Sequence, residues 1–107
     1  MYVLIVRVEV KPRHRPALLG ALVDVIDETR GQEQAALIRF DVIQDSADPN
    51  CLFVYEVWRD AAAFDAHGNA PYYRRFGEQT AEWLVSPPTI LCIGSNLFPP
   101  DEDERWR

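Results

Sequence analysis

The sequence predicts an α+β domain of the ferredoxin-like class, with the element order β-α-β-β-α-β. Four segments are rich in apolar, β-branched and aromatic residues, two carry apolar residues at helical spacing, and no repeat or linker separates them. The length of 107 residues and mass of 12.3 kDa fit one domain. We expect an antiparallel sheet of four strands with both helices on one face, formed by residues 1–98 and followed by an acidic tail at residues 99–107.

The first half of the chain is expected to form a strand, a helix and a second strand. Residues 2–11 alternate as a strand does, Pro12 ends this strand, and Pro16 suits the first turn of a helix. Gly31 is the expected stop of that helix, and residues 36–44 are the expected second strand. The helix carries apolar residues three and four positions apart, namely Leu18, Leu19, Leu22, Val23 and Ile26.

The second half is expected to begin with a hairpin, whose loop at residues 45–50 leads into a strand at residues 51–58. Asp60 is a natural N-cap for a short helix at residues 61–67. The helix breakers Gly68, Asn69 and Pro71 follow this helix. The chain is then expected to form a second helical stretch at residues 72–85 and a fourth strand at residues 90–98.

The predicted strands are apolar on both faces. In the strand at residues 51–58, Phe53 and Tyr55 point one way, and Leu52 and Val54 point the other. An antiparallel sheet with one face in water alternates apolar and polar residues. Because the helices of one chain cover one face only, we expect a homodimer that closes its two sheets into a barrel.

Composition excludes several classes of partner. Seventeen acidic and eleven basic residues give a net charge of −6, which disfavours nucleic acid and an anionic membrane surface. The apolar run Met1–Val6 is far shorter than the ~20 residues of a membrane span, and Glu9 follows too soon for a signal peptide, so the cytoplasm is the expected location. Cys51 and Cys92 lie in apolar runs and are expected to be buried thiols, neither disulfide-bonded nor zinc ligands.

Glu56 is the most conspicuous candidate for a functional residue. It shares a face with Leu52, Val54 and Trp58 in an otherwise apolar strand. A carboxylate there is costly unless it is paired, and burial would raise its pKa toward the range of a general base. Either it forms an ion pair with an arginine of a neighbouring strand, Arg7 or Arg39, or it belongs to a site.

Other polar residues offer further candidates. Arg39 and Asp41 share one face of a strand and either pair with each other or contact a partner. His67 suits proton transfer if it faces the gap between helices and sheet, and is structural otherwise. Of Tyr72 and Tyr73, one should pack inward while the other faces outward or into a pocket. The sequence has no GxGxxG, P-loop, GxSxG or HExxH motif, so no cofactor and no metal are expected.

Two stretches resemble the antibiotic biosynthesis monooxygenase family. The family pattern is Glu-x-Trp, an acidic or small cap, and then Ala-His-x-x-x-Pro, which matches residues 55–60 followed by residues 64–73. Residues 39–45 further resemble the subgroup containing the isomerase that acts on phosphorylated autoinducer-2 breakdown products. The resemblance extends over residues 2–98.

The resemblance implies a dimeric ferredoxin-like barrel and a family of cofactor-free oxygenases that convert anthrones or hydroquinones to quinones. Trp58 and His67 match residues that line the family's pocket. The chain departs from the anthrone oxygenases at Val54 and Phe64, where they carry asparagine and tyrosine. It also reads Pro-Tyr-Tyr at residues 71–73, where the isomerase subgroup reads Pro-His-Tyr.

Three hypotheses follow. The first is a cofactor-free monooxygenase acting on a small quinol or polyphenol, with His67 as proton acceptor or orienting donor and Glu56 as its electrostatic partner. The second is an isomerase of a small phosphorylated hydroxy-diketone, with Arg39 or Arg74 as the cation. The third is a small-molecule-binding or structural dimer without catalysis. The residues expected to bind the substrate are Phe53, Trp58, Tyr72, Tyr73, Arg39 and Asp41.

Overall fold

The computed structural model describes residues 1–100, so most of the predicted tail lies outside the described residues. Within that range the chain forms a strand-helix-strand-strand-helix-helix-strand order, with two short 3-10 turns. The elements are β1 (Tyr2–Glu9), η1 (Pro12–His14), α1 (Arg15–Gln32), β2 (Leu37–Gln44), β3 (Cys51–Trp58), α2 (Ala61–Asn69), α3 (Pro71–Thr80), η2 (Ala81–Trp83) and β4 (Thr89–Ser95).

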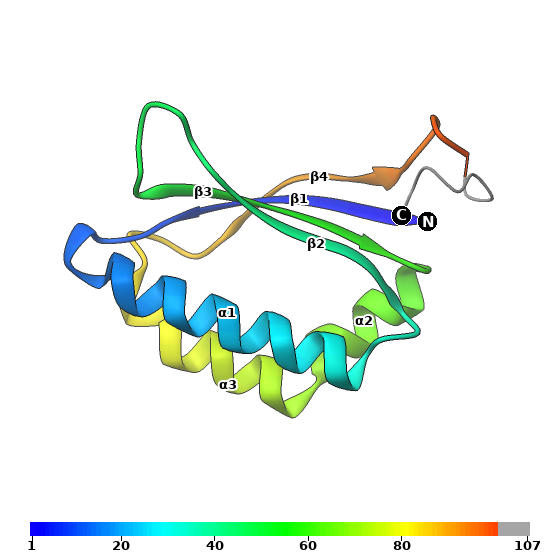
Figure 1. Cartoon of the computed structure of the whole chain (residues 1–107), viewed down its shortest axis with the longest axis horizontal. Helices are drawn as coiled ribbons and strands as arrows, with labels where there is room; N and C mark the ends of the chain where they lie inside the picture. Colours follow the sequence, from blue (N-terminus) through cyan, green and yellow to red (C-terminus); the bar gives the residue numbers. More distant parts are fainter. Residues whose placement is uncertain (101–107) are drawn as a thin grey trace.

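These strands form one antiparallel sheet in the order β2-β3-β1-β4, and the helices lie on a single side of it (Figure 1). This confirms the predicted ferredoxin-like class. The sheet therefore has an inner face, covered by α1 and α3, and an outer face that no helix of the described residues covers (Figure 1).

Several element boundaries follow the sequence signals closely. β3 covers the predicted residues, and Asp60 caps α2 as predicted, since its carboxylate accepts the backbone N–H of Ala63 at 2.8 Å. The predicted stop at Gly31 is wrong, because α1 continues to Gln32 and the N–H of Glu33 still donates to the carbonyl of Thr29 at 2.8 Å.

The second helical region differs more from the prediction. α2 continues through Gly68 and Asn69, and the break falls at Ala70, whose extended backbone is what a following proline requires. The predicted helix at residues 72–85 begins at Pro71 and ends at Thr80. The fourth strand was predicted to reach residue 98, but it ends at Ser95.

The core lies between the inner face and the two longer helices. Its buried residues come from α1, β3, α3 and the segments that follow β1 and η2: Val10, Leu18, Leu22, Val25, Leu52, Tyr72 and Leu84. Within residues 1–100, no helix is long and apolar enough to cross a membrane.

The outer face carries apolar side chains without a helix to cover them. Register places Ile5, Phe53 and Ile43 on this face, and Ile43 is 50% exposed. Cys51 is buried as predicted and both thiols are free. The prediction of a buried Cys92 is wrong, because β4 is an edge strand and Cys92, opposite Ile5, lies on the uncovered face.

Candidate functional site

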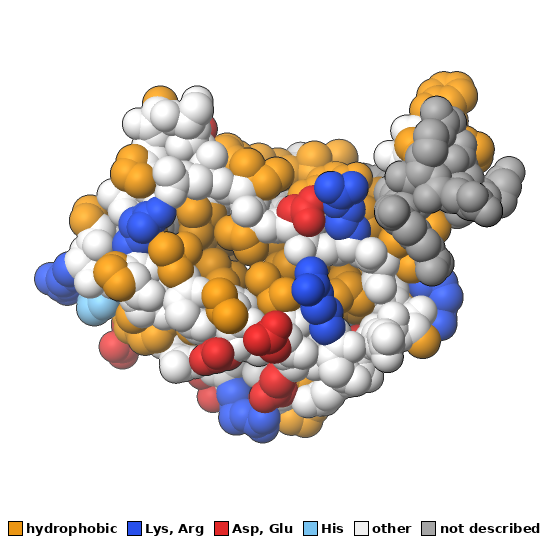
Figure 2. Space-filling view, in the orientation of Figure 1, with side chains coloured by type: hydrophobic (Ala, Val, Ile, Leu, Met, Phe, Trp, Pro, Cys, Tyr) orange, Lys and Arg blue, Asp and Glu red, His pale blue; other side chains and the backbone are white. Residues whose placement is uncertain are grey.

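A cavity of about 560 Å³ lies between the inner face of the sheet and the helices α1 and α3. We call it the inner cavity, and in Figure 2 a hollow lined by hydrophobic side chains marks the region between sheet and helices. Its size falls in the range of small-molecule sites. Its walls are mostly apolar, with Leu4, Val6, Phe40, Leu52 and Val54 from the sheet, and Leu18, Leu22, Phe76 and Leu84 opposite them.

The few polar side chains of this lining include one carboxylate. They are Glu56, Tyr73, Thr80 and Ser86, and the described lining contains no lysine, arginine or histidine. A ligand that enters this cavity therefore meets one group that can exchange a proton near neutral pH, surrounded by hydrocarbon.

Glu56 stands on β3 between Leu4 of β1 and Phe40 of β2. Its side chain is buried, and its carboxylate accepts the indole N–H of Trp58 at 3.1 Å. Burial raises the pKa of Glu56 from the usual 4.5 to about 7, although the hydrogen bond from Trp58 acts in the opposite direction. The carboxylate is thus poised to gain or lose a proton near neutral pH.

The alternative in which Glu56 pairs with an arginine is wrong. Arg7 and Arg39 belong to the outer face, opposite Phe53 and Val57 in the register. They form ion pairs there, Arg7 with Glu9 and Arg39 with Asp41, the latter at 2.6 Å. The expected pairing of Arg39 with Asp41 is confirmed.

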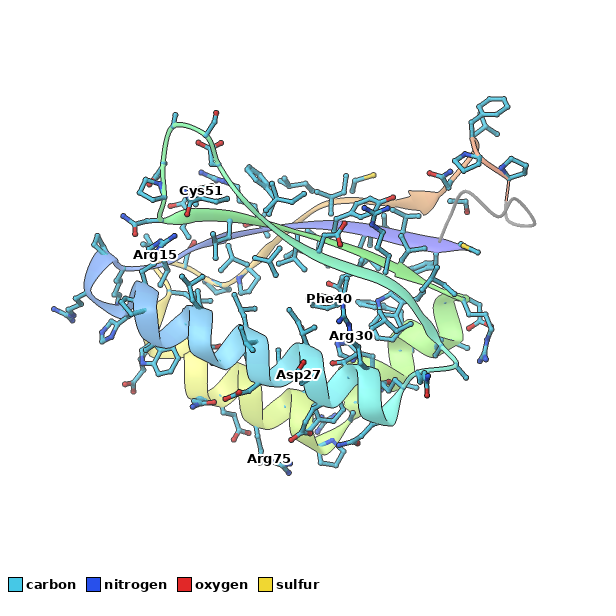
Figure 3. The ribbon with its side chains drawn as sticks, in the orientation of Figure 1. Arg15, Asp27, Arg30, Phe40, Cys51 and Arg75 are labelled. Carbon is cyan, nitrogen blue, oxygen red and sulfur yellow. The ribbon has the colours of Figure 1, made fainter. Side chains whose placement is uncertain are left out.

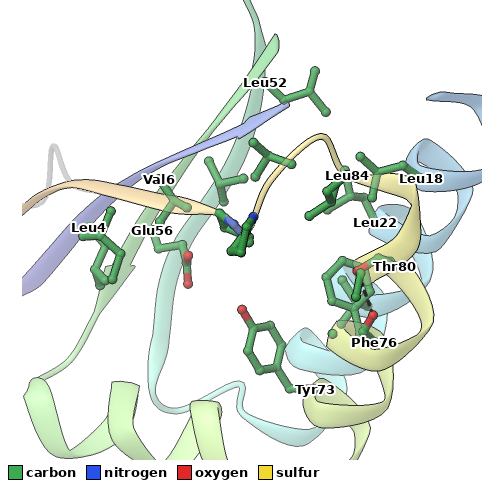
Figure 4. A pocket seen from close by; sticks show the side chains of 18 of the residues that line it. Leu4, Val6, Leu18, Leu22, Leu52, Glu56, Tyr73, Phe76, Thr80 and Leu84 are labelled. Atoms are coloured by element: carbon green, nitrogen blue, oxygen red, sulfur yellow. Dashed lines mark hydrogen bonds between the residues drawn. The ribbon is translucent and has the colours of Figure 1, made fainter. Parts of the chain in front are cut away.

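Tyr73 approaches Glu56 from the helical side. Its ring lines the cavity from α3, and its hydroxyl points toward the carboxylate of Glu56 in Figure 4. Burial, and then the charge of Glu56, raise the pKa of Tyr73 to about 12. The phenol therefore stays neutral at physiological pH and can donate a hydrogen bond to a ligand oxygen.

His67 lies behind this pair and does not line the cavity. Its side chain is 1% exposed, and its ring packs between Trp58 and Tyr73, with centroid separations of 4.5 and 4.1 Å. Burial lowers the pKa of His67, and the neighbouring Glu33 opposes that effect. Of the two alternatives for His67, the structure shows the buried position outside the described cavity lining and not a position facing the gap between helices and sheet.

The protonation of His67 follows from its contacts. Its Nδ1 lies 2.7 Å from the Glu33 carboxylate, so the neutral ring carries its proton on Nδ1 and donates it there. The Nε2 atom is buried and has no hydrogen-bond partner in the described part of the chain. The predicted partner of His67 was Glu56, and this is wrong, because Glu33 at the end of α1 takes that place.

Glu33 belongs to a polar cluster that sequence reasoning missed. The Tyr72 hydroxyl donates to its carboxylate and lies 3.0 Å from the Thr29 hydroxyl, which in turn donates to the carbonyl of Val25. The signal was present in the helical spacing. Thr29 and Glu33 continue the buried stripe of Leu18, Leu22 and Val25 at intervals of three and four.

The remaining predicted residues lie elsewhere. Trp58 is fully buried behind Glu56, and Tyr72 belongs to the polar cluster with Glu33. The register puts Phe53, Arg39 and Asp41 on the outer face. The fold therefore does not bring these three together with Glu56 within one chain, and their role in binding stays a prediction. Among residues 1–100, no group of three His, Cys, Asp or Glu side chains lies close enough to hold a metal ion.

Comparison with known proteins identifies the family. The model of the antibiotic biosynthesis monooxygenase family matches residues 1–79 of this chain. The chain belongs to this family. The match covers β1 through most of α3, and therefore every residue of the Glu56–Trp58–His67–Tyr73 group.

Family relatives carry different names. A 4-hydroxy-5-phosphonooxypentane-2,3-dione isomerase of Yersinia enterocolitica is 33% identical over 79 residues, which are 69% of this chain and 81% of that protein. YcnE of Bacillus subtilis, named as a candidate monooxygenase, is 26% identical over 85% of this chain and 94% of that protein. The protein sll1783 of Synechocystis is 28% identical, and the matched part of this chain spans 55% of its length.

The fold is shared with solved members of the family. A candidate antibiotic biosynthesis monooxygenase from Nitrosomonas europaea superposes with a TM-score of 0.83 and 26% identity, over 92% of this chain and 100% of that one.

Proposed function

We propose that this member of the antibiotic biosynthesis monooxygenase family is a monooxygenase that oxidises a small quinol or polyphenol without a cofactor, with Glu56 as the base. The observation that carries the proposal is a single carboxylate, with a pKa of about 7, inside an apolar cavity and facing a phenol donor. A general base works best when its pKa lies near the operating pH.

The roles follow from the positions of the side chains. Ionised Glu56 accepts the proton of a substrate hydroxyl, and the Tyr73 hydroxyl donates a hydrogen bond to an oxygen of the substrate. The electron-rich phenolate then passes an electron to dioxygen and forms a new carbon–oxygen bond with it. The apolar walls exclude water from these reactive species.

The overall reaction balances without another reductant. One quinol and one dioxygen give one hydroxyquinone and one water, so that one oxygen atom enters the ring and the other leaves as water. The substrate supplies all four electrons. The proton held by Glu56 returns to the departing oxygen, which restores the carboxylate.

His67 has a supporting role in this proposal. It does not line the cavity, but its ring packs against Trp58, which holds Glu56, and against Tyr73. Glu33 fixes the ring of His67 through Nδ1. His67 is thus a positioning residue for both side chains that would contact the substrate.

The isomerase is the second candidate, because a relative with that name is 33% identical. Its substrate name includes a phosphonooxy group, which calls for a cation. The described lining of the inner cavity has none, Arg39 is on the outer face, and the exposed Arg74 donates to Asn69. Figure 3 shows Arg30 of α1 below Phe40 of β2 in this view. Arg30 is exposed and lies outside the described lining, and it is the cation that we propose for this alternative.

We also propose that the working unit is a homodimer. The uncovered outer face and the edge strand β4 expose apolar side chains, with Ile43, Ile90, Leu91 and Ile93 each about half exposed. A second copy that packs against the outer face would remove Ile43 from water, and it would cover the exposed side chains of β4 only if it also packs along that edge strand.

The test is oxygen uptake with labelled dioxygen by wild type, Glu56→Gln and the matched control Glu78→Gln, whose residue is exposed on α3. We expect enzyme-dependent uptake with hydroquinones, one labelled atom in each product, and loss of activity of about 10²–10⁴-fold in Glu56→Gln alone. Equal activity of all three proteins would remove Glu56 from the reaction. Quinone formed without the label would show an oxidase, and turnover of a phosphorylated hydroxy-diketone that Arg30→Gln abolishes would favour the isomerase.

A further inference from the structure

We infer that the substrate of this cavity is elongated, with a hydroxylated ring at Glu56 and an alkyl chain that runs under β3 toward Leu52. The inference rests on the proposed function for the ring, and on the shape and polarity of the inner cavity for the chain.

Polarity is distributed unevenly in the cavity. Glu56 and Tyr73 face each other at one end, and Figure 4 shows Leu18, Leu22 and Leu84 across the cavity from them. The two chemically reactive groups are thus confined to one end. Figure 4 also shows Thr80 on the side of the leucines, but its hydroxyl already donates to the carbonyl of Phe76 at 2.9 Å. The ionisable part of a bound molecule therefore belongs at the end with Glu56 and Tyr73, because these leucines cannot satisfy a charge.

The length of the cavity exceeds one aromatic ring. Glu56 and Leu52 both line it and lie four residues apart on β3, which corresponds to about 13 Å along a strand. The partner strand repeats this span, since β1 places Leu4 opposite Glu56 and Val8 opposite Leu52. A single ring held by Glu56 leaves the Leu52 end empty.

The volume leads to the same conclusion. Protein interiors are close-packed, and about 560 Å³ is enough for a drug-sized ligand. Because the far walls are the aliphatic side chains of Leu18, Leu22, Leu52 and Leu84, the group that fills this end gains most if it is hydrocarbon. An unbranched alkyl chain has this chemistry and can extend along the span from Glu56 to Leu52.

The inference predicts how the affinity for a ligand depends on the length of its alkyl chain. Burying one methylene is worth about 0.8 kcal/mol, which is about a fourfold change in affinity. The dissociation constants of 4-methyl-, 4-propyl-, 4-pentyl- and 4-heptylphenol should therefore fall by about fourfold per added methylene until the chain reaches Leu52. These phenols have one hydroxyl and are used for binding, measured by isothermal titration calorimetry.

Variants locate the chain. Leu52→Phe narrows the far end and should flatten the dependence on chain length while leaving 4-methylphenol within about twofold of wild type. The control Val23→Phe adds bulk on the exposed side of α1 and should keep the wild-type slope. Circular dichroism checks folding, and Leu84→Phe replaces Leu52→Phe if the latter does not fold.

The outcomes separate this inference from the proposed function. Affinity that does not change with chain length, or a slope that Leu52→Phe leaves intact, overturns the inference even if hydroquinones are oxidised. A steep slope that Leu52→Phe removes supports the inference, and if no hydroquinone is then oxidised, it is the proposed reaction that fails.

Discussion

Replacing Glu56 by glutamine should make the protein more stable at alkaline pH. Burial raises the pKa of Glu56 from 4.5 to about 7, so between these values the folded chain keeps a proton that the unfolded chain has lost. The free energy of unfolding of the wild type therefore falls as pH rises through this range. At 1.36 kcal/mol per pH unit, the full loss above pH 7 is about 3 kcal/mol.

Glu56→Gln cannot ionise and keeps an oxygen to accept the indole N–H of Trp58. Its stability relative to the wild type should therefore increase by about 2 to 3 kcal/mol between pH 5 and pH 8. Urea denaturation at several pH values within this range measures the difference directly. The lowered pKa of His67 makes stability rise with pH, but His67 is present in both proteins, so its contribution cancels in the difference.

The exposed control Glu78→Gln should follow the wild-type curve at every pH. Parallel curves of unfolding free energy against pH for wild type and Glu56→Gln would refute the reasoning, because they would mean that folding does not change the pKa of Glu56. In that case the pKa of Glu56 would not be raised toward 7, and the proposal that Glu56 acts as a base near neutral pH would lose its support.

Three further predictions concern activity, the buried cluster and assembly. The kcat/KM of the wild type for a hydroquinone should rise with pH through about 7 as Glu56 ionises, and a flat oxygen-uptake profile between pH 5.5 and 8.5 would contradict this. Glu33→Gln replaces the carboxylate that accepts the Nδ1 proton of His67, and we expect it to lower the free energy of unfolding in urea by about 1–3 kcal/mol. Ile43→Asp places a charge on the outer face and should shift the mass measured by light scattering from dimer to monomer, whereas an unchanged mass would exclude that face as the interface.

The sequence predicted what depends on local patterns. The alternation in β3 and the cap at Asp60 are short-range signals, and both are confirmed. The stop at Gly31 failed for a related reason, because glycine permits a helix end but does not impose one, and the hydrogen bond of Glu33 to Thr29 carries α1 past it. Cys92 was misplaced because an apolar run does not tell which face of an edge strand is covered.

The candidate site was only half predictable. Glu56 stood out because a single carboxylate interrupts an apolar face, and that pattern is visible within one strand. The partnership of His67 with Glu33 joins residues 34 positions apart, from the ends of two helices, and no local spacing encodes it. Sequence reasoning therefore found the residues with unusual chemistry but assigned the wrong partner to the histidine.

The site is built in layers, and this order decides what each side chain can do. Glu56 and Tyr73 line the cavity, His67 packs behind Tyr73 and beside Trp58, and Glu33 holds His67 from the end of α1. Glu33 could contact a ligand in the cavity only if His67 and Tyr73, which lie between them, moved. Loss of Glu33 should therefore act on the reaction through the placement of Tyr73 and of the indole that holds Glu56, whereas loss of Glu56 removes the proton acceptor itself. In the proposed reaction the histidine, the most chemically versatile side chain of the group, would therefore act only through the packing of its ring and its contacts at Nδ1 with Glu33 and Tyr72.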